Sequence, residues 1–186
     1  MDILIVNGHP DPDPGRFCHA LTAAYQRGAE AGGHTVRVLE IATMKIPCLR
    51  SAAESYSGEC PNMELKQAQE AITWSEHIVI VYPLWLGDVP AYFKAFLEHV
   101  FSPGFAFDEK KRGKLHGRSA RIIVTMGMPA FFYRWYFWSH SLISLKRNIL
   151  HFVGIKPVKE TLIGSVDTTD HEKWLKQVEQ LGCSGD

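Results

Sequence analysis

The residues of this sequence that could do chemistry gather in three loops, each of which follows a run of apolar residues. The first loop reads NGHPDPDPGRFCHAL from Asn7 to Leu21 and leads into a helical pattern. The free N–H groups and positive dipole end of such a helix favour a phosphate, and Arg16 at the expected helix start would add charge. An ordinary Pro/Asp turn with Arg16 in solvent is the alternative.

The second loop reads PLWLGDVP from Pro83 to Pro90. Prolines stiffen its two ends, and Gly87 permits backbone conformations that are closed to other residues. Trp85 and Leu86 offer flat apolar surface, so the loop could present backbone donors and acceptors along the edge of a polar aromatic ring. A packed turn around a core tryptophan is the alternative.

The third loop reads TMGMPAFFYRWYFW from Thr125 to Trp138, and seven of its last eight residues are aromatic, out of 21 aromatic residues in the chain. Aromatic patches of this kind mark a ligand slot, a subunit interface or a membrane contact. A simple buried helix would account for several of these rings but not for Arg134 among them. We therefore interpret the segment as an interface or a ligand wall.

Other chemistries lack their motifs. The sequence contains no GxxxxGK[ST], no GxGxxG and no hydroxyl-rich phosphate loop. None of its nine histidines forms HExxH, and GxSxG is absent, which argues against a zinc protease and an α/β hydrolase. We expect no metal site. The basic run KKRGK from Lys110 to Lys114 is interpreted as solvated loop rather than as a nucleic-acid site.

Composition narrows the class of protein further. The 186 residues predict a single domain over 1–186, and 20 basic residues balance 20 acidic ones. A hydrophobic share of 46% fits a globular protein and not a disordered chain or a basic nucleic-acid binder. The first ten residues do not resemble a secretory signal, and no apolar run approaches the about 20 residues of a membrane span. The four cysteines form no CxxC pair, so we expect a cytoplasmic protein.

Strands and helices must alternate to hold the three loops in place. Residues 41–61 show no periodicity and are expected to be a surface excursion. The pattern predicts an α/β fold: a three-layer, doubly wound, flavodoxin-like sandwich with a five-stranded parallel sheet in the order 2-1-3-4-5. Ligands of such sheets bind outside the carboxyl ends of the strands, where all three loops lie. The expected strands are 3–6, 35–39, 78–82, 122–125 and 161–166, and the expected helices begin at 17 and cover about 64–75, 91–101, 139–152 and 171–181.

Longer sequence blocks carry a resemblance to a known family. They are GHP after the first strand, RFCHAL at the first helix, YPLWLGDVPAYFKAFLEHVF with the following PGFAF, TMG after the fourth strand and ILHFVGI near Leu150. Together they resemble the NAD(P)H quinone oxidoreductases, also called DT-diaphorases, and their bacterial relatives such as the modulator of drug activity B. The likeness extends over nearly the whole chain.

The resemblance implies a bound flavin, which we take as FAD with FMN as the alternative, and NAD(P)H as the electron donor. It also implies residue roles. The flavin phosphates would lie near His9, Arg16, Phe17, Cys18 and Ala20, the ring along Pro83, Leu84, Trp85 and Leu86, and the far edge of the ring at Thr125 and Gly127, with Tyr133 over the reactive face and His140 close by.

The implied reaction is a ping-pong cycle, in which NAD(P)H delivers hydride to the flavin and leaves before a quinone takes it up. Tyr133 and His140 would stabilise charge on the reduced flavin or donate a proton. The family is typically homodimeric, and the aromatic segment would suit that arrangement. Nitroaromatic, azo or free-flavin acceptors remain open. So does an ancillary flavoprotein that binds and regulates a membrane potassium-efflux transporter, while a one-electron carrier is disfavoured by the neutral charge.

Overall fold

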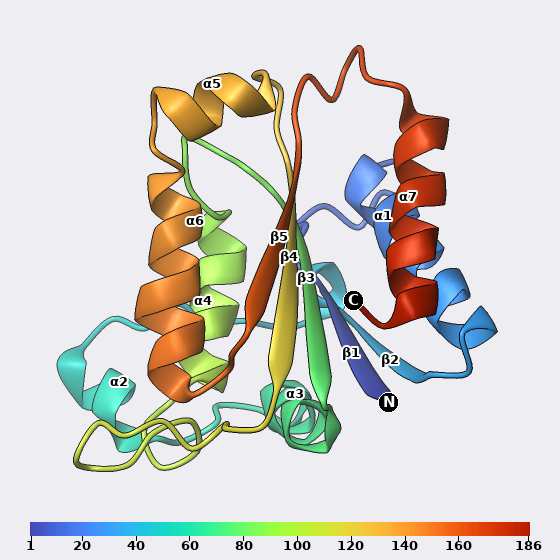
Figure 1. The fold of residues 1–186 in the computed structure, drawn as a ribbon. Coiled ribbons are helices and arrows are strands. Elements are labelled where there is room, and N and C mark those ends of the chain that lie inside the picture. Colours follow the sequence, from blue (N-terminus) through green and yellow to red (C-terminus); the bar gives the residue numbers. More distant parts are fainter.

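A five-stranded parallel sheet forms the centre of the computed structural model, which describes residues 1–186 (Figure 1). The strand order is β2-β1-β3-β4-β5, so the predicted fold class and topology are confirmed. All seven residues of the central strand β3 are buried, which explains its unbroken apolar run. The strands are β1 (Asp2–Asn7), β2 (Thr35–Glu40), β3 (His77–Pro83), β4 (Ser119–Thr125) and β5 (Val158–Ile163).

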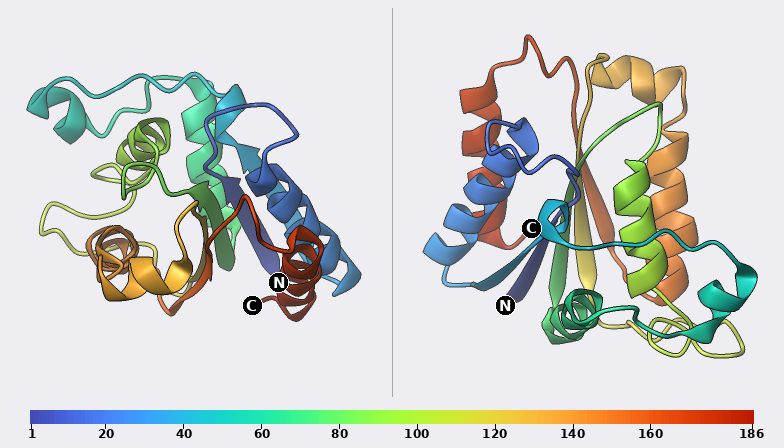
Figure 2. Two further views of the ribbon diagram at one scale, coloured as in Figure 1. Left: turned by 90° about the horizontal axis from the view of Figure 1, so that it is seen from above. Right: turned by 180° about the vertical axis from the view of Figure 1, so that it is seen from behind.

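Helices cover both faces of the sheet, and the view from above in Figure 2 shows the three layers. Helices α1 (Phe17–Ala31) and α7 (His171–Ser184) pack on one face. The other face is covered by α3 (Met63–Trp74), α4 (Ala91–Val100), α6 (His140–Ser144) and the π-helical segment η2 (Leu145–His151). No helix has both the length and the apolar character that a membrane crossing requires.

Two glycines allow α1 and α7 to cross at very short range. A Cβ atom on Gly28 of α1 would overlap the carbonyl oxygen of Glu179, and one on Gly182 of α7 would overlap the carbonyl oxygen of Tyr25. The backbones of the two helices are therefore in direct contact, and any larger side chain at either position would push them apart.

The structure differs from the predicted elements in its short helices and in the starts of β4 and β5. The excursion 41–61 contains the 3₁₀ turn η1 (Ile41–Thr43) and α2 (Ala52–Ser57), and the aromatic segment contains α5 (Ala130–Trp135). These helices are too short to show a periodicity, although Ser51 caps α2 by accepting a hydrogen bond from Glu54 N–H. The fourth strand begins at Ser119 rather than Ile122, because Ser119 and Arg121 interrupt its apolar run. The fifth strand runs from Val158 to Ile163 rather than from Thr161 to Val166, because β5 is an edge strand that exposes Lys159 and Glu160.

Candidate active site

A cavity of about 450 Å³ opens at the carboxyl ends of the strands. The loops that follow β1, β3, β4 and β5 enclose it, as expected for a doubly wound sheet. Six of its lining residues were predicted as cofactor contacts, and four were not. The lining residues are His9, Gly15, Arg16, Phe17, Cys18, Pro83, Thr125, Val166, Asp167 and His171.

The strand ends hold the first two loops at one level. Pro83 of β3 and Thr125 of β4 are paired in register, and Leu84 N–H donates to the Thr125 carbonyl at 2.8 Å. Gly8 N–H donates to the Val81 carbonyl at 2.7 Å. A Cβ on Gly8 would lie 3.0 Å from the Phe93 ring, so only glycine lets the first loop pass this close to α4.

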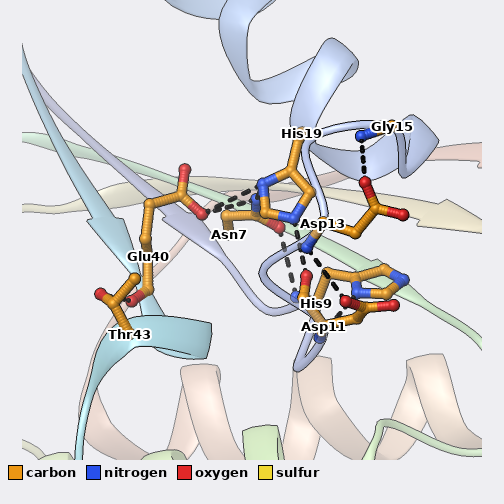
Figure 3. Close-up of polar contacts among 8 residues, drawn as sticks. All are labelled: Asn7, His9, Asp11, Asp13, Gly15, His19, Glu40 and Thr43. Atoms are coloured by element: carbon orange, nitrogen blue, oxygen red, sulfur yellow. Dashed lines mark hydrogen bonds and ion pairs between the residues drawn. The ribbon is translucent and has the colours of Figure 1, made fainter.

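In the first loop, prolines alternate with residues whose backbone N–H groups each donate a hydrogen bond to a side chain of the same segment (Figure 3). His9 N–H donates to Asn7 Oδ1 at 3.2 Å, and Asp11 N–H donates to His9 Nδ1 at 3.1 Å. Asp13 N–H donates to Asp11 Oδ1 at 3.0 Å, and Gly15 N–H to Asp13 Oδ1 at 2.9 Å. Each side chain thus binds the amide two residues further on, and the intervening prolines have no N–H to satisfy.

Three donors at this loop have no acceptor within the protein. Because His9 Nδ1 accepts from Asp11, the proton of the neutral ring is on Nε2, which makes no hydrogen bond although the residue is only 8% exposed. Burial, followed by the nearby His19, lowers the pKa of His9 and keeps the ring neutral at pH 7. The N–H groups of Phe17 and Cys18 at the start of α1 also lack acceptors, and the first turn carries no acidic residue. These donors fit a phosphate.

Arg16 lines the cavity but its charge is already shared. Its Nε donates to Asp11 Oδ2 at 2.8 Å, and its Nη2 lies 3.6 Å from Asp13 Oδ2. The side chain therefore holds the acidic loop together at the surface and would reach a phosphate only as an ion-paired guanidinium.

Cys18 serves packing and not reactivity. Its Sγ lies 3.4 Å from Thr125 Oγ1, which ties the first turn of α1 to the end of β4. Burial raises the pKa of the Cys18 thiol to about 12, so the nucleophilic thiolate does not form at neutral pH.

The second loop forms a two-residue turn beside the first. Trp85 N–H donates to the Asp88 carbonyl and Asp88 N–H to the Trp85 carbonyl, both at 2.9 Å. Leu86 and Gly87 have positive φ angles of 49° and 80°, and the Leu86 side chain is fully exposed. The Trp85 ring meets His9 edge-on with centroids 5.8 Å apart, so the apolar loop and the buried imidazole are neighbours.

His140 stands at the second loop, next to Gly87. A Cβ on Gly87 would lie 3.8 Å from Cε1 and 3.9 Å from Nε2 of the His140 ring. The Nδ1–H of His140 donates to the Phe137 carbonyl at 3.0 Å, which leaves Nε2 free.

Tyr133 requires a correction. It was expected over the reactive face of a flavin, but the structure buries it completely in the core on the inner side of α5. Its hydroxyl is 2.7 Å from Ser141 Oγ and accepts a hydrogen bond from Leu142 N–H at 3.2 Å. The short helix α5 turns this one ring inward while Phe131 and Trp135 stay exposed.

The remaining predicted residues lie outside the cavity lining. Ala20 is half-buried in α1, and Leu84 is half-buried at the base of the second loop. Gly127 is exposed after β4 and has no atom within 4 Å of the place of a Cβ, so open space remains there for a flat ring.

Apart from Gly15 of the first loop, the lining residues that sequence reasoning missed lie between β5 and the first residue of α7. The His171 ring stacks on Phe17 with centroids 4.1 Å apart, and its Nε2 is 2.7 Å from the Val166 carbonyl. Asp167 places a carboxylate in the same wall. The rule that ligands bind at the carboxyl ends of parallel strands, applied to the fifth strand as well, would have found them.

A second hollow of about 270 Å³ lies between α2, α4 and η2. Its walls are mainly apolar, including Tyr56, Phe101 and Phe152, and its charged residues Lys94 and Glu98 pair with each other at 2.6 Å. This hollow lacks the converging free donors that the cavity at the strand ends has. The cavity at the strand ends is therefore the candidate active site.

Comparison with known proteins agrees with this fold. A family model described as flavodoxin-like fold matches residues 1–181, and the chain belongs to that family.

Among curated relatives, an uncharacterized NAD(P)H oxidoreductase of Haemophilus influenzae is 25% identical, with 96% of this chain and 91% of the relative covered. Human ribosyldihydronicotinamide dehydrogenase [quinone] is 28% identical over 55% of this chain and 48% of its own. A ribosyldihydronicotinamide dehydrogenase-like protein of Penicillium crustosum is 25% identical over 68% of this chain and 58% of its own. The chain thus spans about half the length of the human and fungal relatives.

Solved structures show the same fold. Smu.1420 from Streptococcus mutans superposes with a TM-score of 0.84 at 29% identity over 99% of this chain and all of its own. The NAD(P)H:quinone oxidoreductase of Methanothermobacter marburgensis has a TM-score of 0.83 at 22% identity, covering 99% and 96%. An FMN-dependent NADH-azoreductase of Bacillus anthracis in complex with FMN has a TM-score of 0.70 at 17% identity, covering 100% and 97%. The resemblance to the oxidoreductases noted in the sequence is confirmed.

Proposed function

We propose that this chain is a flavin-dependent NAD(P)H oxidoreductase that passes two electrons to a quinone or a similar flat acceptor. The cavity at the strand ends carries the proposal, because the free donors of the first loop meet the apolar surface of the second loop there. The names of the Haemophilus and human relatives support the choice of donor and acceptor.

The residues present fit the FMN moiety that FMN and FAD share. His9 Nε2 and the N–H groups of Phe17 and Cys18 would hold its phosphate. The backbone of 83–86 would run along the ring, with the open space at Gly127 beside it. The sequence resemblance favours FAD, whereas the Bacillus neighbour contains FMN, so mass analysis of the released cofactor decides between them.

A bound flavin supplies the two-electron chemistry itself. The chain orients the reactants and manages protons at the mouth of the cavity. His140 is suited to this task because its Nδ1–H is held by the Phe137 carbonyl and its Nε2 faces the second loop. As imidazolium, Nε2 would give a proton to a reduced quinone oxygen, and as neutral imidazole it would take one up again.

The test begins with the absorption spectrum of the purified protein. A flavin band that bleaches on anaerobic addition of NADPH and returns with benzoquinone is the expected result. Absence of any flavin, together with failure to bind added FMN or FAD, would rule the proposal out. Parallel lines in initial-velocity plots are expected for a shared slot, and intersecting lines count against it.

We further propose that the chain acts as a homodimer joined through its aromatic segment. Five rings of this segment are exposed, with Trp135 and Trp138 each at 77%, in a molecule of zero net charge. Exposed aromatic clusters of this size are typical of interfaces. The fully exposed Leu86 would extend the same apolar surface.

Light scattering tests the dimer, and the Trp135→Ala/Trp138→Ala protein should be monomeric. A fully active monomer from the unaltered chain would remove the dimer. If both tryptophans were instead needed for retention by a membrane fraction, the regulatory protein of a membrane transporter would become the better function.

A further inference from the structure

A polar network of Asn7, His19 and Glu40 lies behind the first loop, and none of these three residues lines the cavity (Figure 3). Asn7, the last residue of β1, is fully buried and uses its side-chain amide in three directions. Its Nδ2 donates to His19 Nδ1 and to Glu40 Oε2, both at 2.8 Å, and its Oδ1 accepts from His9 N–H at 3.2 Å.

The hydrogen bonds of this network have consistent donors and acceptors when the His19 ring is neutral, and His19 Nδ1 also lies 3.4 Å from Glu40 Oε2. His19 Nε2 donates to the Asp11 carbonyl at 2.8 Å, so the neutral ring accepts at Nδ1 and the Asn7 amide can donate there. Glu40 accepts the second amide proton, which prevents the amide from turning over. Glu40 itself is positioned at the end of β2, where Thr43 Oγ1 donates to its carbonyl at 3.0 Å.

The orientation of the Asn7 amide decides what the first loop presents to the cavity. Only with Oδ1 turned toward the loop does Asn7 accept from His9 N–H, and only with that turn closed does Asp11 N–H reach His9 Nδ1. The His9 proton then resides on Nε2, at the cavity. Glu40 and His19 thus determine, through Asn7, which nitrogen of His9 is offered to a ligand.

We propose that Glu40 and His19 are positioning residues for the flavin phosphate: they hold the Asn7 amide so that His9 presents Nε2–H and loop 8–16 keeps its shape. Neither side chain lines the cavity. The inference rests on the proposed function, since it assigns the phosphate of FMN to this loop.

Binding of FMN is compared with binding of riboflavin, which lacks the phosphate, by quenching of flavin fluorescence. Glu40→Ala should weaken FMN by about five- to ten-fold, the loss expected for one buried hydrogen bond, and leave riboflavin unchanged. Glu40→Gln keeps an acceptor for Asn7 and should restore FMN affinity. His19→Leu tests the other arm of the network with the same expectation as Glu40→Ala.

The matched control is Glu30→Ala, because the Glu30 carboxylate accepts from Gln26 on the exposed side of α1 and takes no part in the network. It should bind both ligands as the unaltered protein does. Equal losses for FMN and riboflavin, or no loss for FMN in either Glu40→Ala or His19→Leu, would overturn the inference alone. Failure of the unaltered protein to bind FMN and FAD would overturn the proposed function, and this inference with it.

Discussion

At the scale of single residues, the candidate site depends on hydrogen-bond roles more than on charge. The one guanidinium at the cavity is occupied by Asp11 and Asp13, while the free donors are neutral: a buried imidazole and two backbone amides. A neutral donor set binds a phosphate mono- or diester through geometry, so the position of His9 matters more than the charge of Arg16.

We expect Tyr133 to contribute to stability and His140 to contribute to turnover. Tyr133→Phe removes a buried hydroxyl that bonds to Ser141 and Leu142, so it should lower the free energy of unfolding by about 1–3 kcal/mol in urea titrations. Quinone turnover should change by less than about two-fold, whereas His140→Gln should lower it at least about ten-fold. If Tyr133→Phe lost turnover while its stability stayed unchanged, the result would support the original prediction that Tyr133 lies over the reactive face of the flavin.

At the scale of elements, the turn at 85–88 stores strain next to the site. Leu86 adopts a positive φ angle with its side chain fully in solvent, a conformation that favours asparagine or glycine. A strained, exposed leucine is costly to the free protein, which points to a use for its apolar surface when ligand or partner is present.

Leu86→Asn should therefore stabilise the flavin-free protein by about 1 kcal/mol in thermal unfolding, because asparagine tolerates the left-handed region. Flavin affinity or dimerisation should weaken in the same variant. Gly87→Ala, at a φ of 80°, should have the opposite effect on stability. If Leu86→Asn destabilised the flavin-free chain, the turn would not be strained.

The crossing of α1 and α7 gives a second prediction for an element. Gly28→Ala would bring a Cβ onto the Glu179 carbonyl, so the helices must separate. We expect a net loss of about 1–3 kcal/mol in urea unfolding, even though alanine favours helix by up to about 1 kcal/mol. Gly127→Ala is the control for stability, since its Cβ would meet no atom within 4 Å. Unchanged stability of Gly28→Ala would show that the crossing yields without cost.

At the scale of the whole molecule, the two edges of the sheet have different tasks. The carboxyl ends of the strands hold the cavity, and a buried polar network lies near their amino ends. His77 Nδ1 is 2.7 Å from Ser119 Oγ and its Nε2 is buried without a partner. Beside it, the buried Arg121 donates to Thr161 Oγ1 at 2.8 Å and lies 3.5 Å from Asp186 Oδ1.

This amino edge makes the molecule sensitive to acid. Burial, followed by the charge of Arg121, lowers the pKa of His77 from its ordinary 6.5 to about 4. Between about pH 6.5 and pH 4, His77 therefore binds a proton in the unfolded chain but not in the folded one. The contribution of His77 to stability should be complete above pH 6.5 and should fall as the pH drops toward 4, by up to about 3 kcal/mol. Urea midpoints at pH 7 and pH 5 measure this loss.

His77→Gln should flatten that pH dependence, because glutamine does not titrate. His116→Gln provides the matched control and should keep the slope of the unaltered protein. A full slope in His77→Gln would mean that other groups dominate the acid response.

The sequence predicted best those elements whose burial leaves a clear pattern of apolar residues. The central strands read as apolar runs because both faces are covered, and the meeting of the loops follows from strand order alone. The inward turn of Tyr133 was not predictable, because a six-residue helix shows no periodicity to identify its buried side. The wall formed by His171 was missed because no motif marks it.

That wall has a consequence for biosynthesis. The cavity combines His9, near the beginning of the chain, with His171, which stacks on Phe17 from the first turn of the last helix. A nascent chain emerges N-terminus first, so the ribosome must release α7 before the pocket exists. A cofactor bound by these residues would therefore be loaded only after α7 has emerged, and a chain that stopped before α7 would carry most of the sequence blocks of the resemblance without the complete cavity.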